Sequence, residues 1–434
     1  MPPVIVAGMS LFPWLLSMTF VSISHSTSQS RLEELYSWRQ VDFVFPSDSV
    51  RQAALASGAY IPENNLPLGL EIWGDRIFVS FPKWRPGIPA TLTTIPRDPE
   101  GDSSPALKPY PNWSWHLQTN CDGLTSVFRM ATDRCGRLWV LDSGTVDIAI
   151  NMTQKCPPQI LVFNLLTDQL LWRYRLPDDQ FKDNSLFINI AVDDRGNHCE
   201  DTFAYLADAF RYGLVVYSWN EDRSWRIESN YFYPEPLHGD YEIHGVTFQW
   251  SDGLFGLALS PEDRNGERSL FFHAMSSYRE FVVPTSFLRN ETASKDANPY
   301  AFRVLEEPRG LYRSQSSGSA MDRQGVLFYN LVSRDAVGCW NSRQPYGFRM
   351  DLQDIIAYDN TSLIYPNDLK VDQEAHQNVW VLSNRFPIYR YSVLDPHDVN
   401  YRILTAPTDS IVMGTVCDPN YMYIPSEWIC EREY

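Results

Sequence analysis

A short two-strand unit recurs along this chain and constrains its fold more than any other feature. Its clearest copy lies within Cys121–Gly144, where Ser126–Ala131 and Leu138–Leu141 are rich in apolar and β-branched residues, as strands are. The residues between them, Asp133 to Gly136, have the composition of a tight polar turn. The unit is therefore an apolar strand, a turn resembling D-x-x-G, and a second strand that carries an aromatic residue.

This unit occurs six times at a nearly regular spacing. The aromatic positions of the six second strands are Phe78, Trp139, Tyr205, Phe272, Phe328 and Trp380. Successive positions differ by 61, 66, 67, 56 and 52 residues, enough chain for four short strands with their loops. The repeat predicts an all-β fold, a six-bladed β-propeller in a single domain. The alternative of two β-sandwiches needs a linker near the middle of the chain, and no Gly/Ser- or Pro-rich break occurs there.

The chain ends are expected to lie outside the blades. The apolar run Pro3–Ile23 predicts a signal peptide at residues 1–24, with an uncleaved membrane anchor as the alternative. Residues 25–420 are assigned to the propeller and residues 421–434 to a C-terminal tail. After cleavage no membrane association is expected.

Two segments are candidates for closing the ring of blades. One is a strand around Phe43, and the other is the C-terminal segment Tyr401–Leu404. Residues Arg31–Arg39, ahead of the first candidate, are expected to form a short helical arm.

The charge of the chain disfavours a nucleic-acid partner and fits a soluble extracellular protein or one that binds a cation. The net charge is −17 and the isoelectric point is about 4.9, whereas a nucleic-acid partner requires basic patches. Four N-x-S/T sequons agree with a secreted, extracellular glycoprotein. Their asparagines are Asn112, Asn151, Asn290 and Asn360. The oligomeric state is left open.

The cysteines fit a disulfide framework once they are placed on blades. They are Cys121, Cys135, Cys156, Cys199, Cys339, Cys417 and Cys430. Cys121 precedes a first strand and Cys156 follows the second strand of the same blade, so both lie on one face. Cys135 and Cys199 lie on the other face, in turns of adjacent blades, so we predict Cys121–Cys156 and Cys135–Cys199. The next two are expected to pair across the ring closure, which leaves the last one unpaired.

Several motifs resemble a known family. They are CDGLTSVFR at 121–129, CGRLWVLDSG at 135–144, CPPQILVF at 156–163 and AVGCWN at 336–341. They are similar to the Yellow and major royal jelly protein family of insects, over residues 37–418. The resemblance implies a secreted six-bladed propeller. It implies melanin and cuticle pigmentation, dopachrome conversion, binding of biogenic amines, or nutrient and signalling roles, because family members differ in these.

No compact catalytic motif such as G-x-S-x-G, H-E-x-x-H or a P-loop occurs, so candidate site residues come from the channel. The first strand of each blade lines this channel in a propeller. Candidates from the strand starts, and from one loop assigned to the same face, are Phe128, Phe187, Asn189, Ser317, Ser319, Asn341 and Asp368. Such a mixture suits a small aromatic amine or catecholamine derivative, with its ring stacked on a phenylalanine and its ammonium held by Asn341 or a carboxylate. The aromatic candidates also fit the blade core, which the residue pattern favours, and Asp368 also fits a turn cap.

His244 is the candidate catalytic base, because an imidazole titrates near the pH at which a carbon-bound proton of dopachrome would be removed. A single histidine in an apolar strand is also compatible with a purely structural role. Glu71, Asn189 and Asp368 are weak candidates for a Ca²⁺ site, since they offer only oxygen ligands. No other cofactor is expected.

Three functional hypotheses follow. The first is a pigmentation protein that binds a catecholamine derivative, with or without dopachrome isomerisation. The second is a non-enzymatic amine-binding, structural or signalling glycoprotein. The third is a Ca²⁺-dependent hydrolase resembling lactonases and esterases.

Overall fold

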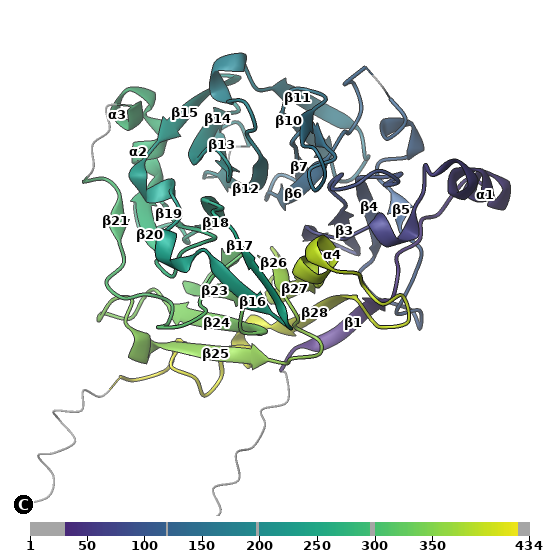
Figure 1. Cartoon of the computed structure of the whole chain (residues 1–434). Coiled ribbons are helices and arrows are strands. Elements are labelled where there is room, and N and C mark those ends of the chain that lie inside the picture. Colours follow the sequence, from purple (N-terminus) through teal and green to yellow (C-terminus); the bar gives the residue numbers. More distant parts are fainter. Residues whose placement is uncertain (1–30, 119, 197–198, 296–299, 424–434) are drawn as a thin grey trace, which may run out of the picture.

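The computed structural model describes residues 31–118, 120–196, 199–295 and 300–423. It contains six four-stranded antiparallel sheets, and their innermost strands contact one another in cyclic order around a central channel (Figure 1). The predicted six-bladed propeller is therefore confirmed. The predicted signal peptide and Cys430 lie outside the described residues.

The strands of each blade are given from the channel outward. The first three blades are β2 (Leu70–Trp73), β3 (Arg76–Ser80), β4 (Leu92–Pro96) and β5 (Lys108–Pro109); β6 (Val127–Thr132), β7 (Arg137–Asp142), β10 (Gln159–Asn164) and β11 (Leu170–Arg175); and β12 (Phe187–Asp194), β13 (Thr202–Asp208), β14 (Gly213–Ser218) and β15 (Arg223–Glu228). The last three are β18 (Leu254–Leu259), β19 (Ser269–Ala274), β20 (Phe281–Pro284) and β21 (Arg303–Val304); β22 (Ser319–Met321), β23 (Val326–Leu331), β24 (Ala336–Asn341) and β25 (Gln353–Tyr358); and β26 (Pro366–Val371), β27 (Asn378–Ser383), β28 (Tyr401–Pro407) and β1 (Glu33–Trp38).

Smaller elements decorate the blades. They are the hairpins β8 (Thr145–Val146) with β9 (Thr153–Gln154) and β16 (Asp240–Ile243) with β17 (Val246–Gln249), and the helices α1 (Asp48–Ser57), α2 (Thr285–Arg289), α3 (Glu291–Lys295), α4 (Phe386–Tyr391) and α5 (Thr408–Val412). Among the described residues, none of these helices has the length and apolarity that crossing a membrane requires. The four sequon asparagines are all exposed.

The ring is closed by the N-terminal strand. β1 pairs antiparallel with β28 and forms the outermost strand of the sixth blade, whose other strands come from the C-terminal part of the chain (Figure 1). The helix expected at Arg31–Arg39 is therefore wrong. Tyr36 and Trp38 are buried on either side of a half-exposed serine, and this alternation is the strand period. Phe43 makes only an isolated bridge to Leu107.

The turn aspartate and the aromatic residue of the repeat are bonded to each other. Asp133 Oδ1 accepts hydrogen bonds from backbone N–H groups two and four residues later, at 2.9 and 3.0 Å. Its Oδ2 accepts one from the Trp139 indole at 2.7 Å. Asp372 and Trp380 repeat the contact at 2.9 Å in the sixth blade. Tyr205 and Asp193 form the corresponding bond at 3.2 Å in the third blade. In these three blades the bond holds the turn and the second strand together. The aromatic positions of the other blades are phenylalanines, which are buried in the core.

The fourth blade is preceded by an additional hairpin. β16 and β17 form a separate two-stranded sheet, and the innermost strand of the blade, β18, begins at Leu254. The cause is a two-residue turn at His244 and Gly245, whose φ values of 46° and 82° suit a hairpin. The D-x-x-G turn of this blade is Asp263–Gly266, where Asp263 Oδ1 accepts two backbone hydrogen bonds.

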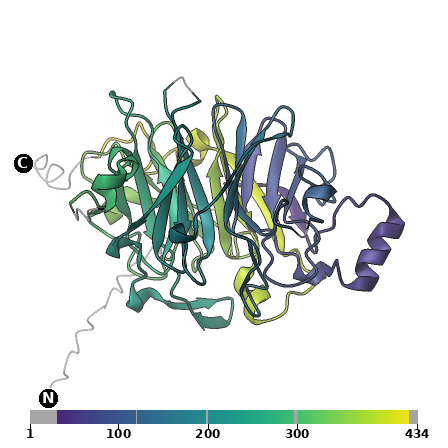
Figure 2. The same cartoon turned by 90° about the horizontal axis from the view of Figure 1, so that it is seen from above.

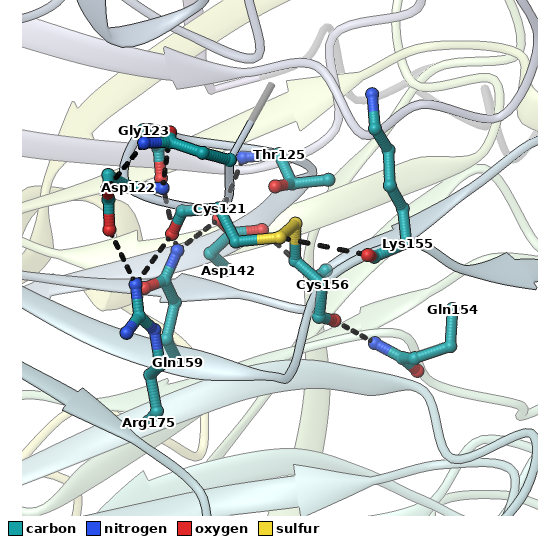
Figure 3. The surroundings of a disulfide bond; sticks show 12 residues. Cys121, Asp122, Gly123, Thr125, Asp142, Gln154, Lys155, Cys156, Gln159 and Arg175 are labelled. Atoms are coloured by element: carbon teal, nitrogen blue, oxygen red, sulfur yellow. Dashed lines mark hydrogen bonds and ion pairs between the residues drawn. A yellow bond between two sulfur atoms is a disulfide. The ribbon is translucent and has the colours of Figure 1, made fainter. Parts of the chain in front are cut away.

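The disulfides confirm the predicted pairing on both faces. The bonds are Cys121–Cys156, Cys135–Cys199 and Cys339–Cys417, with Cα–Cα distances of 5.6, 5.8 and 6.1 Å. We call the face where the innermost strands begin the start face, and the face of the D-x-x-G turns the turn face. The first bond lies on the start face, where Arg175 donates to the Cys121 carbonyl at 3.0 Å (Figure 3).

Asp133→Ala tests the contribution of the turn aspartate. The substitution leaves the buried Arg137 guanidinium, 2.6 Å from the carboxylate, and the Trp139 N–H without this partner. We expect a loss of about 3–5 kcal/mol in the free energy of unfolding, measured with denaturant. The exposed Asp178→Ala is the matched control; equal stability of the two variants would contradict the assigned role.

Candidate functional site

The innermost strands of four blades each carry a β-bulge near their start. In β6, Phe128 and Arg129 together face a single residue of β7. One extra residue interrupts the pairing of β12, β18 and β26 at the same level, and these residues are Ile188, Phe255 and Asn367. A bulge turns side chains out of the strict alternation of a strand. All five bulge residues line one cavity in the channel.

This cavity lies at the start face and is mainly aromatic. Its lining comprises Leu68, Trp84, Phe128, Arg129, Leu186, Ile188, Phe210, Trp250, Asp252, Phe255, Met275, Tyr365, Asn367 and Phe386. Its volume is about 30 Å³, room for one or two water molecules. The cavity is therefore closed to an organic ligand in this state of the protein.

Two elements outside the blades contribute to this closure. Trp250, which follows β17, and Phe386, the first residue of α4, both line the cavity, and their rings lie 5.6 Å apart. The hairpin and α4 project from the same face (Figure 2). They are joined by Phe248 stacked on Tyr391 at 5.0 Å and by a hydrogen bond from the Trp250 indole to the Tyr391 hydroxyl.

Three polar groups in the lining have free hydrogen-bonding capacity. The Trp84 indole N–H and the Arg129 Nη1 are buried and have no hydrogen-bond partner in the described part of the chain. Asp252 is half-buried, and no hydrogen bond or ion pair to its carboxylate is found among the described residues. Burial raises the pKa of Asp252 to about 7. Buried polar groups are normally paired, so this cavity offers two donors and one acceptor to a ligand.

Arg129 forms the floor of the cavity. Its Nε lies 3.0 Å from Asp368 Oδ1, its Nη2 donates to the Asn367 carbonyl at 2.6 Å, and its guanidinium carbon lies 5.2 Å from the centre of the Phe255 ring. Asp368 Oδ2 also accepts from the Leu70 N–H at 2.9 Å. Burial lowers the pKa of Arg129, but an arginine remains charged at neutral pH. These contacts join the first, second, fourth and sixth blades across the channel.

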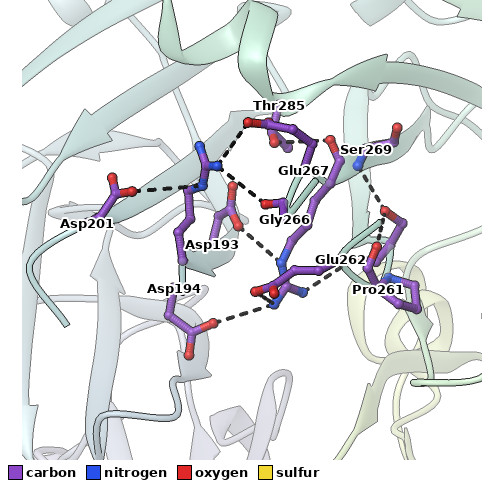
Figure 4. A network of polar contacts seen from close by, with 12 residues as sticks. Asp193, Asp194, Asp201, Pro261, Glu262, Gly266, Glu267, Ser269 and Thr285 are labelled. Carbon is purple, nitrogen blue, oxygen red and sulfur yellow. Dashed lines mark hydrogen bonds and ion pairs between the residues drawn. The ribbon is translucent and has the colours of Figure 1, made fainter. Parts of the chain in front are cut away.

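A wider and strongly polar pocket opens on the turn face. It measures about 320 Å³, and its lining includes Glu71, Ser319 and Lys370. Lys370 Nζ lies 3.4 Å from Glu71 Oε2, whose pKa is raised by burial. At the rim, Arg268 contacts Asp193, Asp194 and Glu262 at 3.3, 3.8 and 3.1 Å, part of the network in Figure 4. Its charged groups are mostly paired, so it is a weaker candidate for an aromatic ligand than the start-face cavity.

Of the sequence-predicted site residues, Phe128 lies in the start-face cavity. Phe187 is fully buried in the core between the second and third blades. Asn189 uses its amide between the Phe255 carbonyl and a neighbouring backbone N–H, both at 2.9 Å. Ser317 donates to the carbonyl of residue 366 at 2.7 Å, and Ser319 lines the turn-face pocket. The structure thus divides this set between the two faces and the core.

The predicted placement of Asn341 is wrong. This residue ends the third strand of its blade opposite Val326, the first residue of the second strand, and therefore lies on the turn face. Its Oδ1 accepts from the Arg343 N–H at 3.0 Å. The loop that follows Asn341 joins the third and fourth strands of this blade, whereas the prediction placed it between the second and third strands.

The predicted placement of His244 in a channel-lining strand is also wrong. It occupies the tip of the β16–β17 hairpin, is exposed, and its Nε2 lies 2.8 Å from Asp335 Oδ2. It is not among the residues that line the cavity.

The weak calcium candidates do not share a site. Asp368 binds Arg129, Glu71 faces Lys370, and Asn189 bonds to backbone groups. Within the described residues, no three or more His, Cys, Asp or Glu side chains are grouped in a way that could hold a metal ion.

Sequence reasoning missed Asp252 and three of the aromatic residues around it. Trp84, Trp250 and Phe386 lie in connections between strands or at a helix start. The strand repeat does not predict which way side chains point in such segments. The one available signal is the position of Asp252-Gly253 directly ahead of the β18 strand.

Comparisons with known protein sequences agree on the family. A family model described as "Major royal jelly protein" matches residues 125–417. "Dopaminechrome tautomerase" of Drosophila melanogaster is 44% identical over 402 residues, which cover 92% of this chain and 86% of that protein. "Protein yellow" of Drosophila yakuba is 43% identical over 427 residues, 96% of this chain and 77% of that protein.

Among solved structures, a luciferin-regenerating enzyme is similar with a TM-score of 0.44 and 10% identity. The match covers 79% of this chain and 91% of that one. A virginiamycin B lyase from Staphylococcus aureus has a TM-score of 0.42 and 9% identity, over 79% and 95% of the two chains.

Arg129→Met tests the floor of the cavity. The variant leaves the buried Asp368 carboxylate without its cation, and we expect the free energy of unfolding to fall by about 3–5 kcal/mol. Adding Asp368→Asn removes the unpaired charge and should restore a large part of that loss. Denaturant unfolding of both variants measures the effect; a double variant no more stable than Arg129→Met would contradict the ion-pair account.

Proposed function

Because the chain belongs to the major royal jelly protein family, we propose that it is a secreted protein of melanin and cuticle pigment chemistry. In this proposal it takes a catecholamine-derived aminochrome into the start-face cavity and tautomerises it to a dihydroxyindole. The relative named as a dopaminechrome tautomerase supports this substrate class. The exposed sequons and the three disulfides support an extracellular location.

The observation that carries the proposal is the aromatic cavity with unpaired donors. An aminochrome is flat, and the rings of Trp84, Phe128 and Phe255 offer apolar faces to it. Its two carbonyl oxygens are acceptors, which match the free Trp84 N–H and Arg129 Nη1. These oxygens gain negative charge as the quinone becomes a catechol, so donors fixed in advance stabilise the transition state more than the substrate.

Such a ligand can enter only if the β16–β17 hairpin and α4, which close the cavity, move apart. The closed cavity holds about 30 Å³, far less than a two-ring molecule occupies. The contact of the β16–β17 hairpin with α4 is built from a few ring contacts, such as Phe248 on Tyr391. In the proposed cycle the hairpin swings away, admits the ligand and closes again, which excludes water from the reaction.

The alternative is an amine carrier without turnover. An aromatic cavity with one unpaired carboxylate also suits a protonated catecholamine or serotonin, because the ammonium pairs with Asp252 and the ring stacks on the aromatic wall. Tight amine binding without loss of aminochrome would select this alternative.

Trp84→Phe tests the proposed site. The variant keeps an aromatic ring but removes the N–H donor, and we expect kcat/KM for dopaminechrome to fall about 10–150-fold, the range for one lost hydrogen bond to a charged oxygen. Decay of dopaminechrome absorbance measures the rate, beside calorimetry with dopamine. Trp172→Phe, on the outer strand β11, is the matched control. Equal rates for Trp84→Phe and the control would show that the reaction takes place at another site. If the unmodified protein did not accelerate dopaminechrome loss, the proposed tautomerase activity would be refuted.

A further inference from the structure

We propose that Asp252 is the catalytic base of this site, which removes a carbon-bound proton from the aminochrome. This assignment rests on the proposed tautomerase function and deepens it. It replaces the role that the sequence suggested for His244.

The position of Asp252 supports this role. It lies between the covering hairpin and β18, and it lines the cavity together with the bulge residue Phe255. A base at this position sits beside the ligand and becomes enclosed when the hairpin closes. No other carboxylate in the lining competes with it, since Asp252 is the one acidic residue there.

The carboxylate is also free to accept a proton. Asp368, which lies below the cavity, is held by Arg129 and by two backbone N–H groups. Asp252 has no such bonds among the described residues. The ionisable groups that interact with it electrostatically are the phenols of Tyr241 and Tyr365, and Arg129 is the cation of the lining. Burial raises the pKa of both phenols, so both stay neutral and Asp252 is the group that titrates near neutral pH.

The chemistry balances without an oxidant. Asp252 takes a proton from the saturated ring carbon attached to the six-membered ring. The C–H electron pair becomes a double bond to that ring, the quinone electrons shift onto one carbonyl oxygen, and this oxygen takes a proton from water. Asp252 returns its proton to the hydroxide left behind and is again a free carboxylate. It then takes a proton from the carbon next to nitrogen, whose electron pair forms the indole double bond, and the second oxygen is protonated by water in the same way. Two C–H bonds are replaced by two O–H bonds, so the product is an isomer.

The electrostatics suit such a base. A carboxyl group of ordinary pKa is too weak to remove a carbon-bound proton efficiently, and a group matched to the working pH is better. Burial places the pKa of Asp252 at about 7. A carboxylate whose pKa is raised in the folded protein destabilises the fold above its ordinary pKa, and such a cost is typical of residues kept for function.

Asp252→Asn is the test, since it keeps the shape and removes the base. We expect kcat for dopaminechrome to fall at least 100-fold, while the calorimetric Kd for an uncharged catechol stays within about threefold. The unmodified protein should lose activity as the pH falls below about 7, and this acidic limb should disappear from the residual rate of the variant. The variant should melt at the same or a higher temperature at pH 8, because an unpaired charge is removed. Asp252→Glu should retain part of the rate.

A control variant lies outside both the cavity and the hairpin. Asp178→Asn makes the same change at an exposed carboxylate between β11 and β12 and should keep the rate within about threefold of the unmodified protein. His244→Ala removes the other candidate base, and a larger fall in kcat than in Asp252→Asn would overturn the assignment.

The outcomes separate this inference from the proposed function. Unchanged turnover in Asp252→Asn, or a parallel loss of binding and turnover, would overturn the base assignment and leave the tautomerase standing. An unmodified protein that does not accelerate dopaminechrome loss would overturn both.

Discussion

The ion pair between Arg129 and Asp368 is the interaction on which the interior of this propeller depends. It crosses the channel, and its two side chains also reach backbone groups and the Phe255 ring on other blades. Two charges removed from water are stable only when both are satisfied, and this requirement fixes the relative positions of the innermost strands. Arg129 lines the closed aromatic cavity on the start face, whereas the open polar pocket lies on the turn face.

The β-bulges determine which side chains line the start-face cavity. Strict alternation would point the residues at this level between the blades, as it does for Phe187, which is buried in the core. The extra residues in β6, β12, β18 and β26 instead bring Phe128, Arg129, Phe255 and Asn367 into the channel. Polar groups left unpaired there reduce stability. Two such donors, the Trp84 N–H and Arg129 Nη1, lie in the same aromatic cavity as the Asp252 carboxylate, and this combination marks the start face as functional.

The sequence predicted the blades well and the site poorly, for physical reasons. Several blades are specified locally, because an aspartate such as Asp133 bonds its own turn and the aromatic residue of the following strand. The disulfides followed from the faces that such blades impose. Bulges leave no mark in the residue pattern, since Phe128 looks like any core aromatic. The residues that close the cavity, such as Trp84 and Trp250, come from connections whose path depends on tertiary contacts.

The central claim is that the start-face cavity is the ligand site. A crystal structure of the protein with a non-reactive catechol amine such as dopamine tests it directly. The account predicts a ligand stacked between the aromatic walls above Arg129, its catechol oxygens near Trp84 Nε1, and the β16–β17 hairpin displaced from its closed position. A ligand bound instead in the turn-face pocket beside Glu71 and Lys370, with the aromatic cavity still closed, would contradict it.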